Sequence, residues 1–183
     1  MHGIALVTGN EGKANEYAGL LGVEVTRISA DLVEIQSLDV AEVVRQKAAA
    51  AYSQVRRPVL VDDTGLALRA WNGLPGALVR WFLQTVGPAG LLTMATGLTD
   101  RRATATVALG YADADGVRVF TGALDGVLTT APRGGGGFGY DPVFQPDGSD
   151  LTLAEMSDEV KNKISHRRLA VDSMRKALGI KPG

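Results

Sequence analysis

The sequence contains no cysteine among its 183 residues. Thiol nucleophiles, zinc sites built from thiolates and disulfide bonds are therefore excluded. A surplus of positive charge is also lacking, because the formal net charge is -1 and charged residues make up 21% of the chain. A protein that binds nucleic acid through its phosphates needs a clear excess of lysine and arginine. We therefore expect no nucleic-acid partner, and any anion site must be local.

Long apolar runs are missing as well. The first ten residues, MHGIALVTGN, carry no basic leader, and their apolar run is far too short for a signal peptide or a membrane span. The simplest interpretation is a cytoplasmic protein without a membrane partner. The length fits a single domain, 1–183, in which roughly 70% of the unfolded chain's surface can be buried. No internal repeat or long linker divides it, and GGGG is its one low-complexity tract.

The first third of the chain alternates apolar runs with helical patterns. The run GIALVT is bounded by glycine and predicts a buried strand. The next segment carries Tyr17 and Leu21 at helical spacing and closes on Gly22. Asp39, followed three residues later by Glu42, has the pattern of a capping box. We predict strands over 3–8, 23–28 and 58–63, and helices over 11–22 and 39–55.

The sequence pattern changes in the rest of the chain. Residues 75–97 predict two short helices broken at the Gly-Pro pair 87–88. Residues 102–130 alternate and are rich in β-branched side chains, and DADG at 113–116 predicts a hairpin turn between two strands. A last helix is predicted over 166–178. A βαβα beginning followed by an antiparallel meander indicates an α/β fold with a mixed twisted sheet flanked by helices.

The stretch TGNEGK, residues 8–13, joins the first predicted strand to the first predicted helix. It differs from a P-loop, because only two residues separate Gly9 from Gly12 and because Lys13 is followed by Ala14 instead of a hydroxyl residue. The unpaired N–H groups and the dipole of a helix N-terminus still favour an anion here, with Lys13 beside it. The alternative is an ordinary turn with a solvated lysine.

Lys47 falls on the apolar face of the second predicted helix, which Val43, Val44, Ala48 and Ala51 define. An inward-facing lysine needs an anionic partner, because burial of an unpaired ammonium is very costly. The alternative is an amine that reaches solvent along its apolar stem.

Asp62 and Asp63 end the third predicted strand, where open α/β sheets usually bind ligands. Neighbouring carboxylates repel each other and are usually paired with a cation, and oxygen ligands suit magnesium. Glu34, in the loop before the second helix, could supply a further oxygen. The alternatives are an Asp-Thr-Gly turn that uses its carboxylates as hydrogen-bond acceptors, and an ordinary surface glutamate.

The stretch RGGGGFGYDPVF combines backbone freedom with two aromatic rings, Phe138 and Tyr140, and then with Asp141 before a proline. Glycines let a chain approach a ligand closely, and an aromatic ring offers a flat face to a nucleobase. The alternative is a mobile loop whose aromatic side chains insert into the core.

The stretch EVKNKISHRRLA concentrates basic residues in an otherwise neutral chain: Lys161, Lys163, His166, Arg167 and Arg168. Ser165 is the natural N-cap of the last helix, so basic side chains would occupy its first turn. Positive charge there opposes the helix dipole, and this local cost indicates a function. The alternative is a solvated basic face.

These segments together supply cationic anchors, an acidic metal site, a ring for stacking and a cluster of hydrogen-bond donors. A nucleoside triphosphate bound with magnesium needs all four. We therefore predict that the segments converge on one nucleotide.

Four stretches, TGNEGK, VDDTGL, GGFGYDPVF and KNKISHRRLA, also occur in the order and at the approximate positions typical of a known family. From about residue 5 to residue 178 the chain resembles the inosine triphosphate pyrophosphatases. The resemblance implies a homodimeric α/β protein with a central cleft between two lobes. It also implies magnesium-dependent hydrolysis of noncanonical purine nucleotides, ITP, dITP and XTP, to the monophosphate and pyrophosphate.

The resemblance assigns roles by position. At the phosphates it implies Thr8, Asn10, Lys13 and Lys47. At the metal it implies Glu34, Asp62 and Asp63, with Asp63 also acting as the general base. It implies that the purine stacks on Phe138. Around the edge of the purine it implies Gly139, Tyr140, Asp141, Lys161, Ser165, His166 and Arg167.

The chain departs from the family's usual Glu-Asp pair, which is Asp62-Asp63 here, so the exact metal role of Asp62 stays open. Residues 71–87 are similar to the archaeal and eukaryotic version of a segment that lies near the dimer contact in the family. Two other classes of protein fit the sequence less well. A nucleotide sensor without hydrolysis would lack a base or a metal ligand, and none is missing. A P-loop phosphotransferase is disfavoured by the glycine spacing and by Ala14.

Overall fold

A computed structural model of the chain describes residues 4–22 and 25–179. Within these ranges the strands form a seven-stranded sheet in the order β2-β1-β3-β5-β6-β7, and β4 pairs with the far end of β3. The strands are β1 (Ile4–Val7), β2 (Val25–Ile28), β3 (Val59–Leu68), β4 (Pro75–Gly76), β5 (Arg102–Asp113), β6 (Gly116–Leu128) and β7 (Phe144–Pro146). The sheet is mixed, because β1 runs parallel to β2 and β3 whereas the other pairs are antiparallel.

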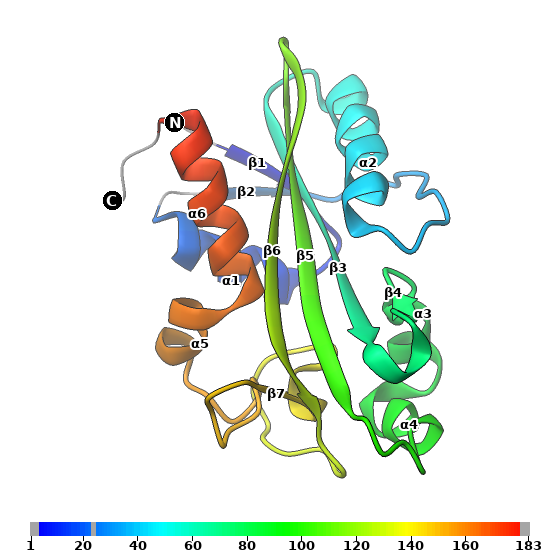
Figure 1. Cartoon of the computed structure of the whole chain (residues 1–183). Helices are drawn as coiled ribbons and strands as arrows, with labels where there is room; N and C mark the ends of the chain where they lie inside the picture. The colour runs from blue at the N-terminus through cyan, green and yellow to red at the C-terminus, as the bar shows by residue number, and fades with distance from the viewer. Residues whose placement is uncertain (1–3, 23–24, 180–183) are drawn as a thin grey trace.

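Helices cover both faces of the long strands β3, β5 and β6. In Figure 1, α1, α5 and α6 lie to the left of these strands, and α2, α3 and α4 lie to the right. The helices are α1 (Glu11–Leu21), α2 (Val40–Val55), α3 (Val79–Thr85), α4 (Gly87–Met94), α5 (Asp158–Ile164) and α6 (His166–Leu178), with short turns η1 (Arg69–Trp71) and η2 (Asp141–Val143). The predicted α/β class, a mixed sheet flanked by helices, is confirmed. In the described part of the chain no helix is long and apolar enough to cross a membrane.

Alternate residues of β3 point to opposite faces of the sheet. Leu60 packs in the cluster formed with α1 and α6, whereas Val61 packs in the cluster formed with α2. The period of two continues along the strand, so Asp62 is directed to the first layer and Asp63 to the second. A single strand thereby places two neighbouring carboxylates in different surroundings.

One edge of β3 has a gap in its pairing. β1 pairs with this edge at Val59 and Leu60, and β4 pairs with it at Leu66 and Ala67. Over residues 61–65, no strand in the described ranges covers the same edge. The opposite edge is paired with β5 along the whole length of β3. Asp62 and Asp63 lie on this unpaired stretch of the edge.

Helix α6 lies directly against β6 because Gly122 has no side chain. A Cβ atom at this position would lie 2.1 Å from the carbonyl oxygen of His166 and 2.8 Å from the amide nitrogen of Ala170. This close approach fixes the start of α6, which Ser165 caps by accepting a hydrogen bond from the backbone N–H of Arg168.

The structure corrects the end of one predicted strand and adds a helix. The third strand continues to Leu68 instead of ending at Asp63, because its pairing with β5 continues through the Thr-Gly step that suggests a turn. Helix α5 was not predicted, since its short polar sequence has little apolar periodicity; Ser157 caps it. The hairpin turn between β5 and β6 and the helix break before Pro88 are confirmed. Gly3 and residues 23–24, parts of two predicted strands, lie outside the described residues.

Candidate active site

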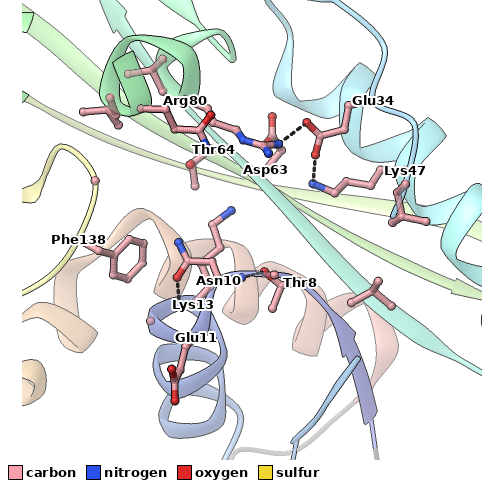
Figure 2. Close-up of a pocket in the computed structure, with 18 of the residues that line it drawn as sticks. Thr8, Asn10, Glu11, Lys13, Glu34, Lys47, Asp63, Thr64, Arg80 and Phe138 are labelled. Carbon is pink, nitrogen blue, oxygen red and sulfur yellow. Dashed lines mark hydrogen bonds and ion pairs between the residues drawn. The ribbon is translucent and has the colours of Figure 1, made fainter. Parts of the chain in front are cut away.

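A cavity of about 1000 Å³ lies beside the gap in the β3 edge. Figure 2 shows that its walls come from segments far apart in the sequence: the turn before α1, the loop before α2, β3 itself, α3 and the glycine-rich loop. A cavity of this size fits a nucleotide-sized molecule. The convergence of these segments is the arrangement that the sequence motifs predicted.

The turn before α1 is held by its own side chains. Thr8 Oγ1 accepts a hydrogen bond from the backbone N–H of Asn10 at 3.1 Å, and Asn10 Oδ1 accepts one from the backbone N–H of Lys13 at 3.2 Å. Asn10 is thus the N-cap of α1. Thr8, Asn10 and Lys13 line the cavity, so the start of this helix and a lysine both face the same space. An anion there would be favoured by the helix dipole and by the ammonium.

Asp62 and Asp63 have different surroundings, as their alternation on β3 requires. Asp63 lines the cavity and is 9% exposed. Asp62 is 2% exposed and does not line it. The Asp62 carboxylate accepts hydrogen bonds from the ammonium of Lys13 at 2.9 Å and from the hydroxyl of Tyr17 at 3.3 Å. Asp62 thereby holds a cation, whereas Asp63 faces the space that a ligand would fill.

The two carboxylates also differ in pKa. Burial raises the pKa of Asp63 to about 6, and the nearby charges of Lys13 and Lys47 only partly offset this effect. Burial acts in the same direction on Asp62, but the charges of Lys13 and Arg167 outweigh it and hold the pKa of Asp62 below its ordinary value. Asp62 therefore stays ionised, whereas Asp63 can accept a proton near neutral pH.

Glu34 lines the cavity between two cations, Lys47 and Arg80 (Figure 2). Its Oε1 accepts a hydrogen bond from Lys47 Nζ at 2.5 Å, and its Oε2 accepts one from Arg80 Nη1 at 2.8 Å. Burial raises the pKa of Glu34, but Lys47 and Arg80 outweigh it, so the pKa lies below the ordinary value. Lys47 has the anionic partner that its inward-facing position requires, and Glu34 links the loop before α2 to α3.

The oxygen atoms at the cavity fit a magnesium ion that is only partly coordinated by protein. Glu34 and Asp63 present carboxylates to the same space, and the charge of Glu34 is close enough to raise the pKa of Asp63. The described residues contain no cluster of three or more acidic, histidine or cysteine side chains suited to a metal. Two carboxylates suffice for magnesium, which usually keeps several waters and takes its other ligands from substrate phosphates.

The glycine-rich loop forms the opposite end of the cavity, where Phe138 lines the wall. Its ring centre lies 4.8 Å from Cζ of Arg167 and 4.9 Å from Nζ of Lys161. Its backbone N–H donates to Asp141 Oδ2 at 2.8 Å, which fixes the loop. The φ angle of Gly139 is +66°, in the region that favours glycine. An aromatic face backed by cations is suited to a purine ring.

Tyr140 lines this end of the cavity, and His166 lies buried behind it. The Tyr140 hydroxyl donates to the carbonyl oxygen of Gly65 at 3.3 Å and lies 3.2 Å from His166 Nε2. A hydroxyl that donates its one hydrogen to Gly65 can only accept from His166, so the two contacts together fit a ring proton on Nε2. Burial and the charge of Arg167 lower the pKa of His166 well below its ordinary value, so the ring is neutral.

The structure brings most of the predicted site residues to the cavity wall. Those that line it are Thr8, Asn10, Lys13, Glu34, Lys47, Asp63, Phe138, Gly139, Tyr140, Asp141 and Arg167. Four others lie behind the wall, buried: Asp62, Lys161, Ser165 and His166.

The sequence-based prediction missed several polar residues at the site, including Glu11, Asp31 and Gln84 on the cavity wall. Thr64 and Arg80 line the cavity, and Glu16 pairs with Arg167 behind it. Glu16 could have been found, because it lies on the same helical face as Lys13 and Leu20, where an acidic side chain is out of place. Thr64 also had a signal in the sequence, because it follows the aspartate pair directly. Arg80 has no comparable signal, since its helix is short and its neighbours show no clear periodicity.

Comparison with known proteins places this site in a family. The Ham1 family model matches residues 4–177. Inosine triphosphate pyrophosphatase 2 of Trypanosoma cruzi is 47% identical over 178 residues, which cover 95% of this chain and 91% of that protein. The dITP/XTP pyrophosphatase of Pyrobaculum aerophilum is 42% identical over 93% of each chain.

Solved structures agree with the sequence comparison. The Ham1 protein of Staphylococcus aureus superposes with a TM-score of 0.83 at 30% identity, covering 97% of this chain and 98% of the other. A Ham1 protein of Coxiella burnetii superposes with a TM-score of 0.84 at 27% identity, covering 99% and 100%. Fold and sequence therefore lead to the same conclusion: the chain belongs to the Ham1 family.

Proposed function

We propose that this protein hydrolyses noncanonical purine nucleoside triphosphates, ITP, dITP and XTP, to the nucleoside monophosphate and pyrophosphate. The observation that carries the proposal is one cavity with three distinct parts. It has a cationic helix start, a pair of carboxylates and an aromatic wall backed by Arg167. Relatives of 40–47% identity over most of the chain bear the names inosine triphosphate pyrophosphatase and dITP/XTP pyrophosphatase.

The polyphosphate would lie along the turn before α1. Thr8, Asn10 and Lys13 face this part of the cavity, and Lys47 and Arg80 extend the positive charge on its other side. Lys47 and Arg80 now share Glu34, so they can turn to phosphate oxygens when the nucleotide arrives. Several cations on one polyphosphate stabilise the charge that accumulates on the departing pyrophosphate.

Asp63 is the proposed general base. It accepts a proton from a water molecule whose oxygen attacks the α-phosphorus, and the bond from that phosphorus to the oxygen of the leaving pyrophosphate breaks. Its burial and its raised pKa suit this role. Glu34 and Asp63 would hold magnesium, which when bound withdraws electrons from the phosphoryl group and neutralises the leaving group.

Asp62 was also predicted as a metal ligand, and that role stays a prediction. The position of its carboxylate favours another one, because it faces away from the cavity and pairs with Lys13. We propose that Asp62 holds Lys13 beside the polyphosphate site until the nucleotide binds.

Selectivity for inosine and xanthine over adenine is proposed to come from donors at the purine edge. Arg167 lines the cavity below Phe138, and the buried start of α6 lies next to it. A donor that meets the 6-keto oxygen would be left unpaired opposite a 6-amino group. A site of this kind can reject the wrong base by up to ~10⁴-fold. His166 contributes indirectly, through the hydroxyl of Tyr140.

Two further parts of the proposal concern the assembly and the location. We propose a homodimer, because apolar side chains including Leu38 and Trp81 are exposed around a groove beside the cavity. We propose a cytoplasmic location, where a pool of free nucleotides would provide substrate. Nucleic acid is not a proposed partner, since the net charge is -1.

A product-resolved assay tests the activity. The protein is incubated with ITP and magnesium, and the products are separated by chromatography. IMP with pyrophosphate supports the proposal, whereas IDP with phosphate would indicate a different bond cleavage. Binding of ITP without any product would support the alternative, a purine nucleotide sensor. Repeating the assay with dITP, XTP and ATP, and with a chelator present, tests the base preference and the metal requirement separately.

A further inference from the structure

Charges of alternating sign form a continuous row, partly on the wall of the cavity and partly buried behind it. The row begins at Lys13, whose ammonium lies 2.9 Å from Asp62. Asp62 Oδ2 lies 3.6 Å from Nε of Arg167, and Nη1 of Arg167 donates to Glu16 Oε2 at 3.0 Å. Glu16 Oε1 lies 3.7 Å from Nζ of Lys161. Asp62, Arg167 and Glu16 therefore each have an opposite charge on either side.

The row ends at the glycine-rich loop. Lys161 donates to Asp141 Oδ2 at 2.8 Å, and the same oxygen accepts the backbone N–H of Phe138. The row thus runs from the proposed phosphate end of the cavity to the ring proposed to stack on the base. Its cations and anions balance, which makes its burial tolerable.

Asp62 links the phosphate end of the cavity to its base end, although Asp62 itself does not line the cavity. Lys13 and Arg167 both line the cavity, one at the helix start and one below Phe138. Asp62 lies between these two cations and does not line the cavity. A movement of either cation must therefore change the electrostatic surroundings of the other through the same carboxylate.

Asp62 is shared unequally between its two cations. The distance to Lys13 is that of a hydrogen bond, whereas 3.6 Å to Arg167 Nε exceeds one. Arg167 Nε is buried and has no hydrogen-bond partner within the described part of the protein. A buried donor without a partner is unfavourable, so Arg167 gains stability if Asp62 turns toward it.

We propose that Asp62 is a positioning residue that couples recognition of the base to binding of the polyphosphate. The inference rests on the proposed function of the site. When phosphates attract the ammonium of Lys13, Asp62 loses its nearest cation and closes on Arg167. Arg167 is then fixed for the edge of the purine. Because coupling between binding sites is reciprocal, a correct base in turn frees Lys13 for the phosphates.

Calorimetry with two probes, inosine and pyrophosphate, tests the coupling. The affinity for pyrophosphate is measured with and without saturating inosine, at a fixed magnesium concentration. In the wild-type protein we expect inosine to tighten pyrophosphate binding by about 5-fold or more, within the range typical of coupled sites. In Asp62→Asn each probe still binds, but this factor falls below about 2. Independent binding in the wild-type protein, or the same factor in Asp62→Asn, would overturn the proposal.

A second variant keeps the test decisive if Asp62→Asn does not fold. Glu16→Gln removes the negative charge on the other side of Arg167, so the guanidinium shifts permanently toward Asp62. We then expect the coupling factor to fall without loss of inosine binding; a factor equal to that of the wild-type protein contradicts the proposal. The control is Asp147→Asn, which breaks an exposed pair with Arg102 outside the row and leaves the coupling unchanged.

The same experiment separates this inference from the proposed function. If the site does not take a hypoxanthine base, inosine fails to bind to the wild-type protein and to every variant. If only the coupling is wrong, both probes bind but do not affect each other.

Discussion

At the scale of single residues, the pair Asp62-Asp63 shows how a β-strand separates two identical side chains. Neighbours in a strand face opposite sides, so one carboxylate is surrounded by cations and the other faces the cavity. For Asp62 these cations outweigh the effect of burial and lower the pKa. For Asp63 burial dominates and raises the pKa. Two identical side chains therefore have different roles: Asp62 pairs with Lys13, and Asp63 is the candidate base.

Replacement of the candidate base tests this division. We expect Asp63→Asn to lower kcat for ITP by about 10³-fold, since a positioned general base typically contributes 10²- to 10⁴-fold. Thermal unfolding should occur at the same temperature or slightly higher, because the variant no longer buries a carboxylate. Steady-state kinetics and circular dichroism measure the two effects. Asp115→Asn, in the hairpin turn, is the control and should match the wild-type protein; Asp63→Asn with wild-type turnover would exclude Asp63 as the base.

His166 gives a prediction about pH and stability. Burial, followed by the charges of Arg167, Lys161 and Lys13, lowers its pKa well below 6.5 in the folded protein. Below pH 6.5 the unfolded chain therefore binds a proton that the folded protein does not, so acid favours unfolding. This residue's contribution to stability is complete above pH 6.5 and decreases by up to about 1.4 kcal/mol per pH unit as the pH falls toward the folded pKa.

The comparison with His166→Gln isolates this effect, since glutamine can still donate to Tyr140 but does not titrate. We expect the stability advantage of the wild-type protein at pH 7.5 to shrink at pH 5, by up to about 2 kcal/mol. Urea unfolding at both pH values, without metal, measures it. A difference between the two proteins that does not change with pH would show that His166 is not held neutral.

At the scale of elements, helix α1 and the glycine-rich loop meet at Gly12. A Cβ atom there would lie 2.8 Å from Cδ1 of Phe138, which is too close without movement. Phe138 is carried by a glycine-rich loop, so the ring is the part that moves. We expect Gly12→Ala to raise KM for ITP by about 10-fold, on the scale of 1.4 kcal/mol in binding, while the fold persists.

Gly19 in the same helix is the matched control. A Cβ there would meet only Asn162 Nδ2, at 3.6 Å, an ordinary contact. Gly19→Ala should raise the free energy of unfolding by about 0.5–1 kcal/mol through helix propensity and leave the kinetics unchanged. Kinetics and urea unfolding of the two variants distinguish the ring contact from a general effect on α1. Equal KM values for both would exclude the contact with Phe138 as the cause.

Most elements could be predicted from the sequence because their signals are local. Asp39 and Ser165 cap helices as expected, and the hairpin turn lies at the predicted position. The extension of β3 to Leu68 could not be predicted, since a Thr-Gly step is typical of a turn and only pairing with β5 decides it. Long-range pairing overrides local preference there.

The candidate site was predictable where a residue was unusual for its position. Lys47 on an apolar helix face required an anion, and the structure supplies Glu34. Arg80 was not predictable, because an arginine on a short exposed helix is ordinary until the fold places it across from Glu34. Asp62 and Asp63 point in opposite directions because β3 continues past them to Leu68, whereas the sequence-based prediction ended the strand at Asp63.

At the scale of the whole molecule, the cavity lies where the sheet is incomplete on one edge of β3. The parallel part of the sheet carries the helix start, and the antiparallel part carries the glycine-rich loop and α6. A substrate that bridges the gap touches both parts. This explains why residues from so many segments are needed for one site.

The outer surface next to this gap leads to the last prediction. Leu38 and Trp81 are 52% and 59% exposed and share a groove with Leu78 and Phe82. Apolar side chains gathered around a groove are typical of a contact between proteins, and a second copy of the chain is the proposed occupant.

Leu38→Glu places a charge within the proposed contact, and two copies related by symmetry would bury two such charges. We expect the mass measured by light scattering at micromolar concentration to fall from that of a dimer to that of a monomer. Leu151→Glu is the matched control, because Leu151 is 45% exposed but lies outside the groove. This variant should remain dimeric. A dimer that persists in Leu38→Glu, or a monomeric wild-type protein, would show that the groove is not the contact, and the exposed Trp81 would then need another explanation.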